Sequence, residues 1–428
     1  MSDAASSVLP WAEPAWHSAL GSPYYNESHR KLQAHVRQYI DHSILPHALE
    51  WEAQGDCPES AKHDYAKAGF GLLEVPQEYR PPQSNAVAGI PVDQLDAFHN
   101  LIMVDESARI DGGVATALSG ANVIGVPPII NHGNEEQKQR WLPGLFTRQT
   151  IFCLGITEPS GGSDVGNIKT TARKSSDGRY YTVTGTKKWI TGAQWATHMT
   201  TAVRTGRAGT SGISLLVIPL TSPGISVEKI HNSGNNAGGA SWVRMVDVQV
   251  PAENLLGHEN SGFKYIMTNF NKERFVLAVS CNRKARTCLG TALAYAHERE
   301  TFGKPLVSHQ IIRHKIITLA REVEAHWAWL EQIAYHVQMH GWQSDTIAGR
   351  IALVKVSGGR ILELAAREAQ QIMGGAAYQR NGPGGGGIVE QITRDLRMMV
   401  VGGGSEEILG DLAFREEVKQ ARKRDAKL

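Results

Sequence analysis

The spacing of hydrophobic positions predicts a chain that is helical at both ends and β-rich in the middle. Before residue 150, apolar residues recur at helical spacing in the stretches 27–45, 61–67, 93–109 and 135–141. The pattern then changes to short β-rich runs separated by Gly, Ser and Asp, at 180–184, 199–203, 213–218 and 242–250. Long helical stretches return at 263–299, 309–340 and 344–373. We find no internal repeat of fixed period, which argues against a solenoid.

This order of elements predicts an α+β multidomain protein. We expect a helical N-terminal domain over residues 1–148, a central β-domain over 149–260 and a C-terminal helical bundle over 261–428. The length of 428 residues fits two or three domains better than one small one.

Composition and charge then exclude several classes of protein. Hydrophobic residues make up 41% of the chain, which is ordinary for a folded globular protein and argues against disorder. The formal net charge of +2 gives no field that would attract nucleic acid. The four cysteines form no CxxC pair, so we expect free thiols in a reducing compartment. No apolar run reaches the roughly 18 to 20 residues of a membrane span.

The two ends of the chain bear on its location. The first residues lack the basic and apolar regions of a signal peptide and the Arg-rich pattern of an organellar presequence. The last three, Ala426-Lys427-Leu428, resemble the peroxisomal address Ser-Lys-Leu. We therefore expect a peroxisomal protein if the source is eukaryotic and a cytoplasmic one otherwise.

Two glycine-rich runs and a histidine pair are poor candidates for binding sites. Gly382–Gly387 is expected to be a loop, without the strand and helix that a dinucleotide fingerprint needs. Gly402–Gly404 lacks the Lys-Ser/Thr ending of a P-loop. His336 and His340 lie four apart without a carboxylate partner, which favours a solvated helix face over a metal site. We expect no metal.

Four segments carry the most specific chemistry of the sequence. They are Leu154-Gly-Ile-Thr157-Glu-Pro-Ser-Gly-Gly-Ser163-Asp164, Lys187-Lys-Trp189-Ile-Thr191-Gly192, Tyr295-Ala-His-Glu-Arg299-Glu-Thr-Phe302-Gly-Lys-Pro-Leu306 with Gln310, and Gln371-Ile-Met-Gly374-Gly375. A strand would place Trp189 and Thr191 on one face, although a tryptophan of the core is the simpler interpretation of Trp189 alone. In this order and across this helix–β–helix plan, the segments closely resemble the acyl-CoA dehydrogenase family of FAD enzymes.

The resemblance covers nearly the whole chain from about residue 25, and it implies a fold, a cofactor and an assembly. The fold would be a helical N-terminal domain, a central β-domain and a C-terminal four-helix bundle, usually in a homotetramer. Trp189 would pack on the flavin, and the Thr191 hydroxyl would bond N5, the atom that receives the hydride. Arg299 would grip the FAD pyrophosphate from a neighbouring subunit, so that FAD binding requires at least a dimer.

The same resemblance assigns the remaining binding residues. The implied FAD contacts are Leu154, Ile156, Thr157, Ser163, Trp189, Ile190, Thr191, Arg299, Thr301, Phe302, Gln310, Gln371, Gly374, Gly375, Ser405 and Glu407. The implied contacts to the acyl-CoA substrate are Ser163, Asn271, Arg274 and the backbone N–H of Gly403. Asn271 departs from the acid that some members have there.

The catalytic base departs from the commonest pattern of the family. Many members place a glutamate in a Tyr-Glu-Gly-Thr motif near the C-terminus, where this chain has Gly403. In the long-chain and isovaleryl branches the base lies instead in a Glu-Arg pair on a helix of the C-terminal domain, which Glu273-Arg274 matches. We expect Glu273 to be the base. A surface carboxylate paired with a lysine is the alternative for Glu273, and Glu406 and Glu407 compete for its role but are expected to open the next helix.

The predicted activity is FAD-dependent α,β-dehydrogenation of an acyl-CoA to a trans-2-enoyl-CoA, as in fatty acid β-oxidation. The electron acceptor, an electron-transfer flavoprotein or oxygen, stays open. One rival is an acyl-CoA or nitroalkane oxidase on the same fold. Two others are an inactive flavin-binding relative and a non-catalytic DNA-binding flavoprotein, for which the chain offers only the short basic run 422–424.

Overall fold

The computed structural model describes residues 9–425, so Ala426-Lys427-Leu428 lies outside the described residues. Two compact units make up the chain. The first contains residues up to His42, Asp96–Asp111 and the chain from Arg274 onward, and the second contains Ser43–Leu95 and Gly112–Glu273. The N-terminal segment that the sequence predicts as one domain therefore contributes to both units. The boundaries at residues 148 and 260 stay a prediction.

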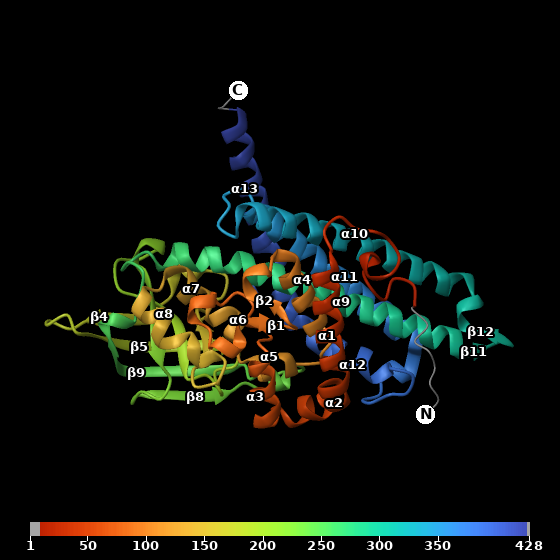
Figure 1. Cartoon of the computed structure of the whole chain (residues 1–428), viewed down its shortest axis with the longest axis horizontal. Helices are drawn as coiled ribbons and strands as arrows, with labels where there is room; N and C mark the ends of the chain where they lie inside the picture. Colours follow the sequence, from red (N-terminus) through yellow and green to blue (C-terminus); the bar gives the residue numbers. More distant parts are fainter. Residues whose placement is uncertain (1–8, 426–428) are drawn as a thin grey trace. The chain divides into compact units, whose positions relative to one another are not determined.

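The first unit is built from long helices. They are α1 (Glu27–Ser43), α4 (Ala97–Ser107), α9 (Gly262–Glu298, which enters this unit at Arg274), α10 (Gln310–His340), α11 (Ala348–Met373), α12 (Gly386–Val401) and α13 (Glu406–Asp425). Helices α9, α10 and α11 run alongside one another (Figure 1). They share one apolar core with α12, and a short hairpin of β11 (Glu300–Thr301) and β12 (Lys304–Pro305) joins α9 to α10.

Helix α10 shows why this part of the chain folds as a bundle. Its buried residues recur every three or four positions, which places them on one face of a helix. They are Ile316, Leu319, Ala320, Val323, His326, Trp327, Leu330, Ile333, Ala334 and Val337. The helix ends at Gly341, whose φ of 72° is readily adopted only by a residue without a side chain. The predicted stretch 309–340 is confirmed to within one residue.

The second unit combines short helices with an eight-stranded sheet. The helices are α2 (Leu45–Gln54), α3 (Glu59–Lys67), α5 (Val114–Ser119), α6 (Asn122–Gly125), α7 (Pro127–His132) and α8 (Glu135–Trp141). The strands are β3 (Phe152–Gly155), β4 (Thr171–Lys174), β5 (Tyr180–Ile190), β6 (His198–Arg204), β7 (Ile213–Pro219), β8 (Ile225–Lys229), β9 (Ser241–Pro251) and β10 (Leu255–Leu256). A two-residue hairpin, β1 (Ala86–Val87) with β2 (Ile90–Pro91), completes the unit.

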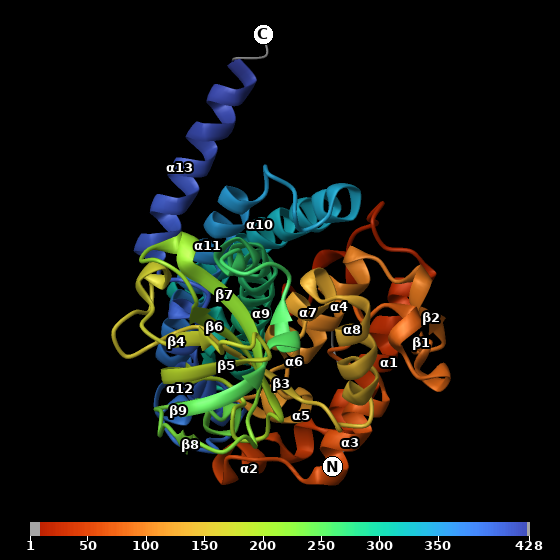
Figure 2. The same ribbon diagram turned by 90° about the vertical axis from the view of Figure 1, so that its left-hand side faces the viewer.

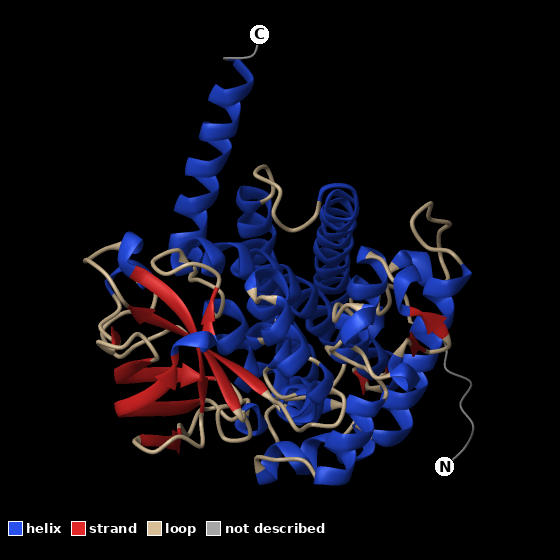
Figure 3. Cartoon of the chain, turned by 60° about the vertical axis from the view of Figure 1, so that its left-hand side comes forward, coloured by secondary structure: helices blue, strands red, loops and turns tan. Residues whose placement is uncertain are grey.

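The sheet has the strand order β10-β7-β6-β4-β5-β9-β8, and β3 adds to β6 in parallel (Figure 2). The strands gather in one part of the unit (Figure 3). Strand β7 is apolar on both faces because Leu215 and Val217 enter one core, whereas Leu216 and Ile218 enter another. A sheet buried on both faces reads as a continuous hydrophobic run, as residues 213–218 do.

The fold class is confirmed, with helices before and after a central β region. Two local expectations are met only in part. The helix expected over 27–45 ends two residues earlier, as α1 at Ser43, and the next helix, α2, starts at Leu45, because Pro46 cannot donate a hydrogen bond to the preceding turn. The glycine run 382–387 is only partly a loop, since Gly386 and Gly387 are the first residues of α12.

The four cysteines are free, as expected, and all four are buried. None of the helices within residues 9–425 combines the length and the apolar character needed to cross a bilayer.

Candidate active site

The first two chemical motifs lie together in the second unit, just after β3 and at the end of β5. Strand β3 leads into Thr157, whose carbonyl oxygen accepts a hydrogen bond from the backbone N–H of Lys188, 2.9 Å away. Leu154, Ile156 and Ile190 are buried and anchor the two segments, whereas Thr157 and Thr191 are half-buried. Ser163 is exposed. The fold thus joins two stretches that are thirty residues apart in the chain.

A buried ion pair underlies this junction. The Lys187 ammonium lies 2.8 Å from Oε1 of Glu158 and donates to the Ile156 carbonyl oxygen at 3.1 Å. Glu158 also accepts from the backbone N–H groups of Lys169 and Thr170, at 2.6 and 3.0 Å. The two ionic side chains are 0% and 3% exposed, so neither charge is screened by water.

Opposing effects set the charge of this pair. Burial lowers the pKa of Lys187 to about 8, although Glu158 opposes the shift. Burial alone would raise the pKa of Glu158, but Lys187 and the hydrogen bonds at its carboxylate lower it below the usual range. No role was predicted for either residue. Two features of the sequence could have pointed to these residues. Glu158 and Lys187 each lie inside one of the two motifs, and Lys187 falls on the buried positions that alternate along β5.

Trp189 differs from what the strand pattern predicts. Its φ of 66° is left-handed and the pairing of β5 with β9 is irregular between Lys187 and Ile190, so Trp189 and Thr191 do not share the face of a regular strand. The interpretation as a core tryptophan is also wrong, because its side chain is 50% exposed. A left-handed, half-exposed tryptophan at the end of a strand offers an aromatic surface to a ligand.

The third and fourth motifs lie in the first unit and are largely exposed. Phe302 stands at the turn of the β11–β12 hairpin with φ 53° and is 96% exposed. Arg299, Gln310 and Gln371 are also exposed, and Thr301 is half-buried.

The backbone at the end of α11 leaves room for a bound group. Gly374 and Gly375 follow this helix, and a Cβ added at either would meet no atom within 4 Å. An exposed aromatic, an arginine and bare glycine backbone suit a nucleotide with a phosphate group.

The expected base, Glu273, belongs to helix α9 in the second unit. Its side chain is half-buried, and its Oε2 atom is shielded from solvent. The neighbouring Lys272 forms an ion pair with Glu74, which lies in the segment that follows α3. A carboxylate that is partly withdrawn from water does not fit the simple surface interpretation.

Asn271 supplies a second polar group on α9. It is 7% exposed, and its Oδ1 accepts no hydrogen bond from any described residue. A buried acceptor of this kind costs free energy unless a ligand or water satisfies it.

The two competing carboxylates lie in the first turn of α13, as predicted. Arg360 binds Glu406 on an exposed face, and this ion pair lowers the pKa of Glu406. Glu407 is also exposed, and Ser405 before it is half-buried. Acidic residues at a helix N-terminus are stabilised by the helix dipole, which accounts for both.

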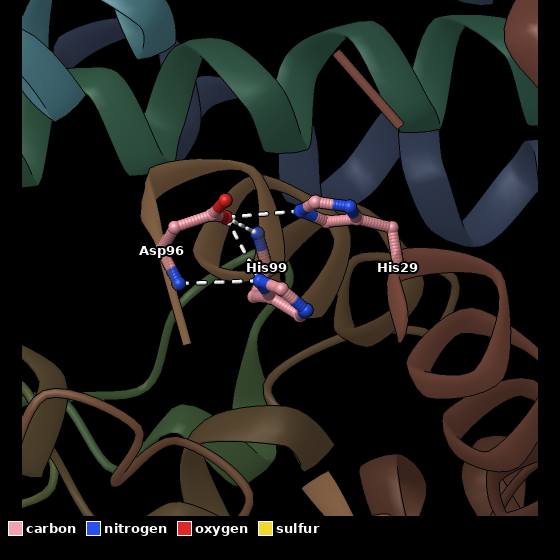
Figure 4. Close-up of side chains that lie close together, drawn as sticks. All are labelled: His29, Asp96 and His99. Carbon is pink, nitrogen blue, oxygen red and sulfur yellow. Dashed lines mark hydrogen bonds and ion pairs between the residues drawn. The ribbon is translucent and has the colours of Figure 1, made fainter. Parts of the chain in front are cut away.

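A cluster of two histidines and an aspartate in the first unit has the composition of a metal site (Figure 4). His29 Nε2 lies 3.0 Å and His99 Nδ1 2.8 Å from Oδ1 of Asp96. The hydrogen bonds give a different account. His29 Nδ1 accepts from the backbone N–H of Asn26 at 3.1 Å, so its proton is assigned to Nε2. A protonated nitrogen cannot ligate a cation, and we interpret the cluster as a pair of linked helix caps.

Comparison with known proteins places these features in a family. The N-terminal, middle and C-terminal domain models of acyl-CoA dehydrogenases match residues 26–149, 153–248 and 260–416. The acyl-CoA dehydrogenase AFT10-1 of Alternaria alternata is 43% identical over 422 residues, which cover 96% of each chain.

Solved structures agree with this match. A probable acyl-CoA dehydrogenase from Mycobacterium abscessus has a TM-score of 0.81 and 32% identity over 91% of this chain and 98% of that one. An acyl-CoA dehydrogenase from Bacillus anthracis complexed with FAD has a TM-score of 0.82 and 25% identity, covering 94% of this chain and 68% of that one.

The chain therefore belongs to the acyl-CoA dehydrogenase family, whose members are FAD-dependent oxidoreductases. Each unit by itself carries residues that fit one part of FAD. In the second unit, half-exposed Trp189 and the Thr157 and Thr191 hydroxyls suit a flavin ring. In the first unit, exposed Phe302 and the open backbone at Gly374 suit an adenosine phosphate group.

Proposed function

We propose that this protein converts an acyl-CoA thioester to the trans-2-enoyl-CoA, with Glu273 as the catalytic base. Its carboxylate takes the proton from the α-carbon, and the electron pair of that C–H bond forms the new double bond to the β-carbon. The β-hydrogen leaves with its own electron pair as a hydride, for which bound FAD supplies the acceptor. Atoms and charge balance, because one proton and one hydride leave the substrate.

The observation that carries this proposal is the geometry of Gly403. Its φ is +66°, and a Cβ added there would lie 3.0 Å from Leu277 Cδ1 and 3.4 Å from Arg274 Cγ. A glutamate at this position would be strained in its backbone and crowded in its side chain. The position used by many relatives is therefore a poor seat for a base, which favours Glu273 of the adjoining Glu-Arg pair. Glu406 is engaged by Arg360, which disfavours it further.

Several polar groups would hold the substrate. The N–H of Gly403 would donate to the thioester carbonyl oxygen and stabilise the negative charge that develops there when the α-proton leaves. The buried Oδ1 of Asn271 accepts no hydrogen bond from any described residue, and it would accept one from the substrate. Arg274 and Ser163 would line the channel for the CoA thioester.

We propose an assembly of at least two subunits, and a homotetramer as the full state. The exposed Phe302 and Tyr378, at 96% and 87%, support this, because each offers an aromatic surface that a neighbouring subunit or its cofactor would cover. Sedimentation of the FAD-loaded protein should give a dimer or tetramer. A monomer that retains FAD would contradict the proposal that a neighbouring subunit completes the cofactor site.

The test of function is anaerobic mixing of the purified protein with saturated acyl-CoAs of different lengths, followed by the visible absorbance of oxidised flavin. The wild type and Glu406→Gln should bleach with some chain length, whereas Glu273→Gln should not. Bleaching of Glu273→Gln at the wild-type rate would reject Glu273 as the base. Failure of every thioester to bleach FAD-loaded wild type would reject the proposed reaction. Oxygen consumption on admission of air would separate an oxidase from a dehydrogenase.

A further inference from the structure

The loop between α12 and α13 is held by two buried cations. Lys355 of α11 donates to the Val400 carbonyl oxygen and, at 3.0 Å, to that of Gly404. Arg274 of α9 donates from Nε to the Gly403 carbonyl oxygen at 2.9 Å. Lys355 is 1% and Arg274 5% exposed. Three carbonyl groups in five residues are thus fixed by charged donors within the first unit.

These contacts determine the direction of one peptide group. The N–H of Gly402 bonds back to the Met398 carbonyl oxygen at 2.8 Å and closes α12. Gly403 and Gly404 then turn at φ +66° and +121°, where a side chain would be strained. Within residues 9–425, the hydrogen bonds of this loop leave the N–H of Gly403 without an acceptor. A fixed, half-buried N–H with no acceptor is the kind of donor that stabilises an oxyanion.

We propose that Lys355, together with Arg274, is a positioning residue that holds the Gly403 N–H against the thioester carbonyl of the substrate. This inference rests on the proposed function. It explains what holds the Gly403 N–H in place before the substrate binds. A flexible run of three glycines would lose conformational entropy each time it bound a substrate. Two buried cations remove that cost beforehand, because they fix the carbonyl groups on both sides of the donating amide.

A purely structural role for Lys355 makes a different prediction. An ammonium at the C-terminal carbonyls of α12 stabilises that helix whether or not the loop binds substrate. Lys284 offers a matched comparison in the same unit. It is 5% exposed and donates to the Ile110 carbonyl oxygen at 2.7 Å and to Asp111 Oδ1 at 3.3 Å, and within the part of the chain that the structure describes no hydrogen bond joins it to the loop. Replacement of either lysine by methionine keeps the volume and removes one buried ammonium.

The test compares Lys355→Met, Arg274→Lys and Lys284→Met as FAD-loaded proteins. Flavin reduction by dithionite and the oxidised flavin spectrum should stay unchanged in all three. We expect the rate of flavin reduction by acyl-CoA to fall about tenfold to a hundredfold in Lys355→Met. This decrease should not exceed the decrease caused by removing an entire oxyanion donor, because the Gly403 N–H is still present in the variant. Arg274→Lys should lose less, and Lys284→Met should keep the wild-type rate even if it unfolds at a lower temperature.

An infrared readout separates positioning from stability. The carbonyl stretch of bound trans-2-enoyl-CoA, labelled with ¹³C at the thioester carbonyl, should shift to lower wavenumber in the wild type and Lys284→Met. The shift should be smaller in Lys355→Met. A wild-type rate and a full shift in Lys355→Met would overturn the inference while leaving the proposed reaction intact. If Lys355→Met does not fold, Arg274→Lys carries the same two readouts, and unchanged values there would overturn it. A wild type that no acyl-CoA reduces would reject both proposals.

Discussion

Lys187 and Glu158 form a fully buried ion pair, with Nζ 2.8 Å from Oε1, directly beneath the two segments assigned to the flavin. Lys187 also bonds the backbone of the other segment at the Ile156 carbonyl, and Glu158 accepts from the amides of Lys169 and Thr170, just before β4. The pair therefore orders the turn that carries Thr157 and the strand end that carries Trp189. Its removal should affect cofactor retention as well as stability.

We expect Lys187→Met to lower the free energy of unfolding by about 3 to 5 kcal/mol and to weaken FAD binding, because it leaves the Glu158 carboxylate buried without its cation. Urea unfolding of the apoprotein and the fraction of FAD retained after gel filtration measure the two effects. The double variant Lys187→Met/Glu158→Gln should recover part of both losses, since no buried charge remains. A double variant no better than Lys187→Met would show that the loss is not electrostatic.

Glu52 ties three segments of the second unit together. Its carboxylate accepts from the backbone N–H groups of Gly113, Asn236 and Ala237, at 2.7, 2.5 and 3.0 Å, and it is 2% exposed. Glu52→Gln keeps the shape but turns an amide group toward backbone donors, so we expect a loss of about 1 to 3 kcal/mol of unfolding free energy. The same substitution at exposed Glu50, on the same helix, should change it by less than about 0.5 kcal/mol. Equal effects in thermal unfolding would contradict this account.

The sequence predicted the long elements well because their patterns repeat. Helix α8 and the ends of α10 lie within one residue of the expected bounds, since each apolar face is sampled over several turns. The short strands β3, β4 and β8 escaped prediction because four or five residues hold too few repeats of a period of two.

The site was predictable only as far as its motifs resemble a family. Thr157, Trp189 and Gly403 follow from those motifs, whereas the left-handed conformation of Trp189 does not, because it arises from an irregular pairing with β9. The contacts of Lys355 and Lys187 were also beyond the sequence. A buried lysine and a surface lysine have the same letter, and only the fold shows that both ammonium groups are enclosed.

The cluster of His29, Asp96 and His99 should be insensitive to metal. His99 Nε2 lies 3.1 Å from Ser28 Oγ, which itself donates to Asn26 Oδ1, so the hydroxyl is available to accept from the ring. Asp96 accepts from the amides of Phe98 and His99 at 2.9 and 3.0 Å and begins α4. Burial would raise the pKa of Asp96, but its hydrogen bonds with His29 and His99 lower it far below its usual value. Oδ1 of Asp96 and the ring nitrogens of both histidines are therefore already engaged in hydrogen bonds.

We expect that a chelator leaves the melting temperature unchanged and that added Zn²⁺ does not raise it. His99→Ala should lower the free energy of unfolding by about 1 to 2 kcal/mol, the usual scale for a lost cap. His42→Ala serves as the comparison, because it removes an exposed histidine whose ring bonds the Gln38 carbonyl of its own helix. A melting temperature that falls with chelator and returns with Zn²⁺ would show that the cluster is a metal site.

Acid should weaken the first unit through Glu13. Its carboxylate binds Arg37 and Arg283, with N–O distances of 2.8 and 2.9 Å, and its side chain is 22% exposed. Burial would raise the pKa of Glu13, but Arg283 and Arg37 outweigh it and lower the pKa from 4.5 to about 2. Because the pKa is lower in the folded state, the ion pairs stabilise the protein above the unfolded value of 4.5, and this stability is lost as the pH falls toward about 2.

The variant Glu13→Gln isolates this contribution. It should be less stable than the wild type by up to about 3 kcal/mol at pH 7. The difference should shrink steadily as the pH falls from about 5 toward about 2, because Glu13 of the unfolded wild type takes up its proton first and Glu13 of the folded protein only near pH 2. Urea unfolding at several pH values measures the difference directly. Glu27→Gln, at an exposed position in the first turn of α1, gives the background for loss of one carboxylate. A gap between wild type and Glu13→Gln that stays constant across this range would mean that packing, and not the charge of Glu13, holds the N-terminal segment to the bundle.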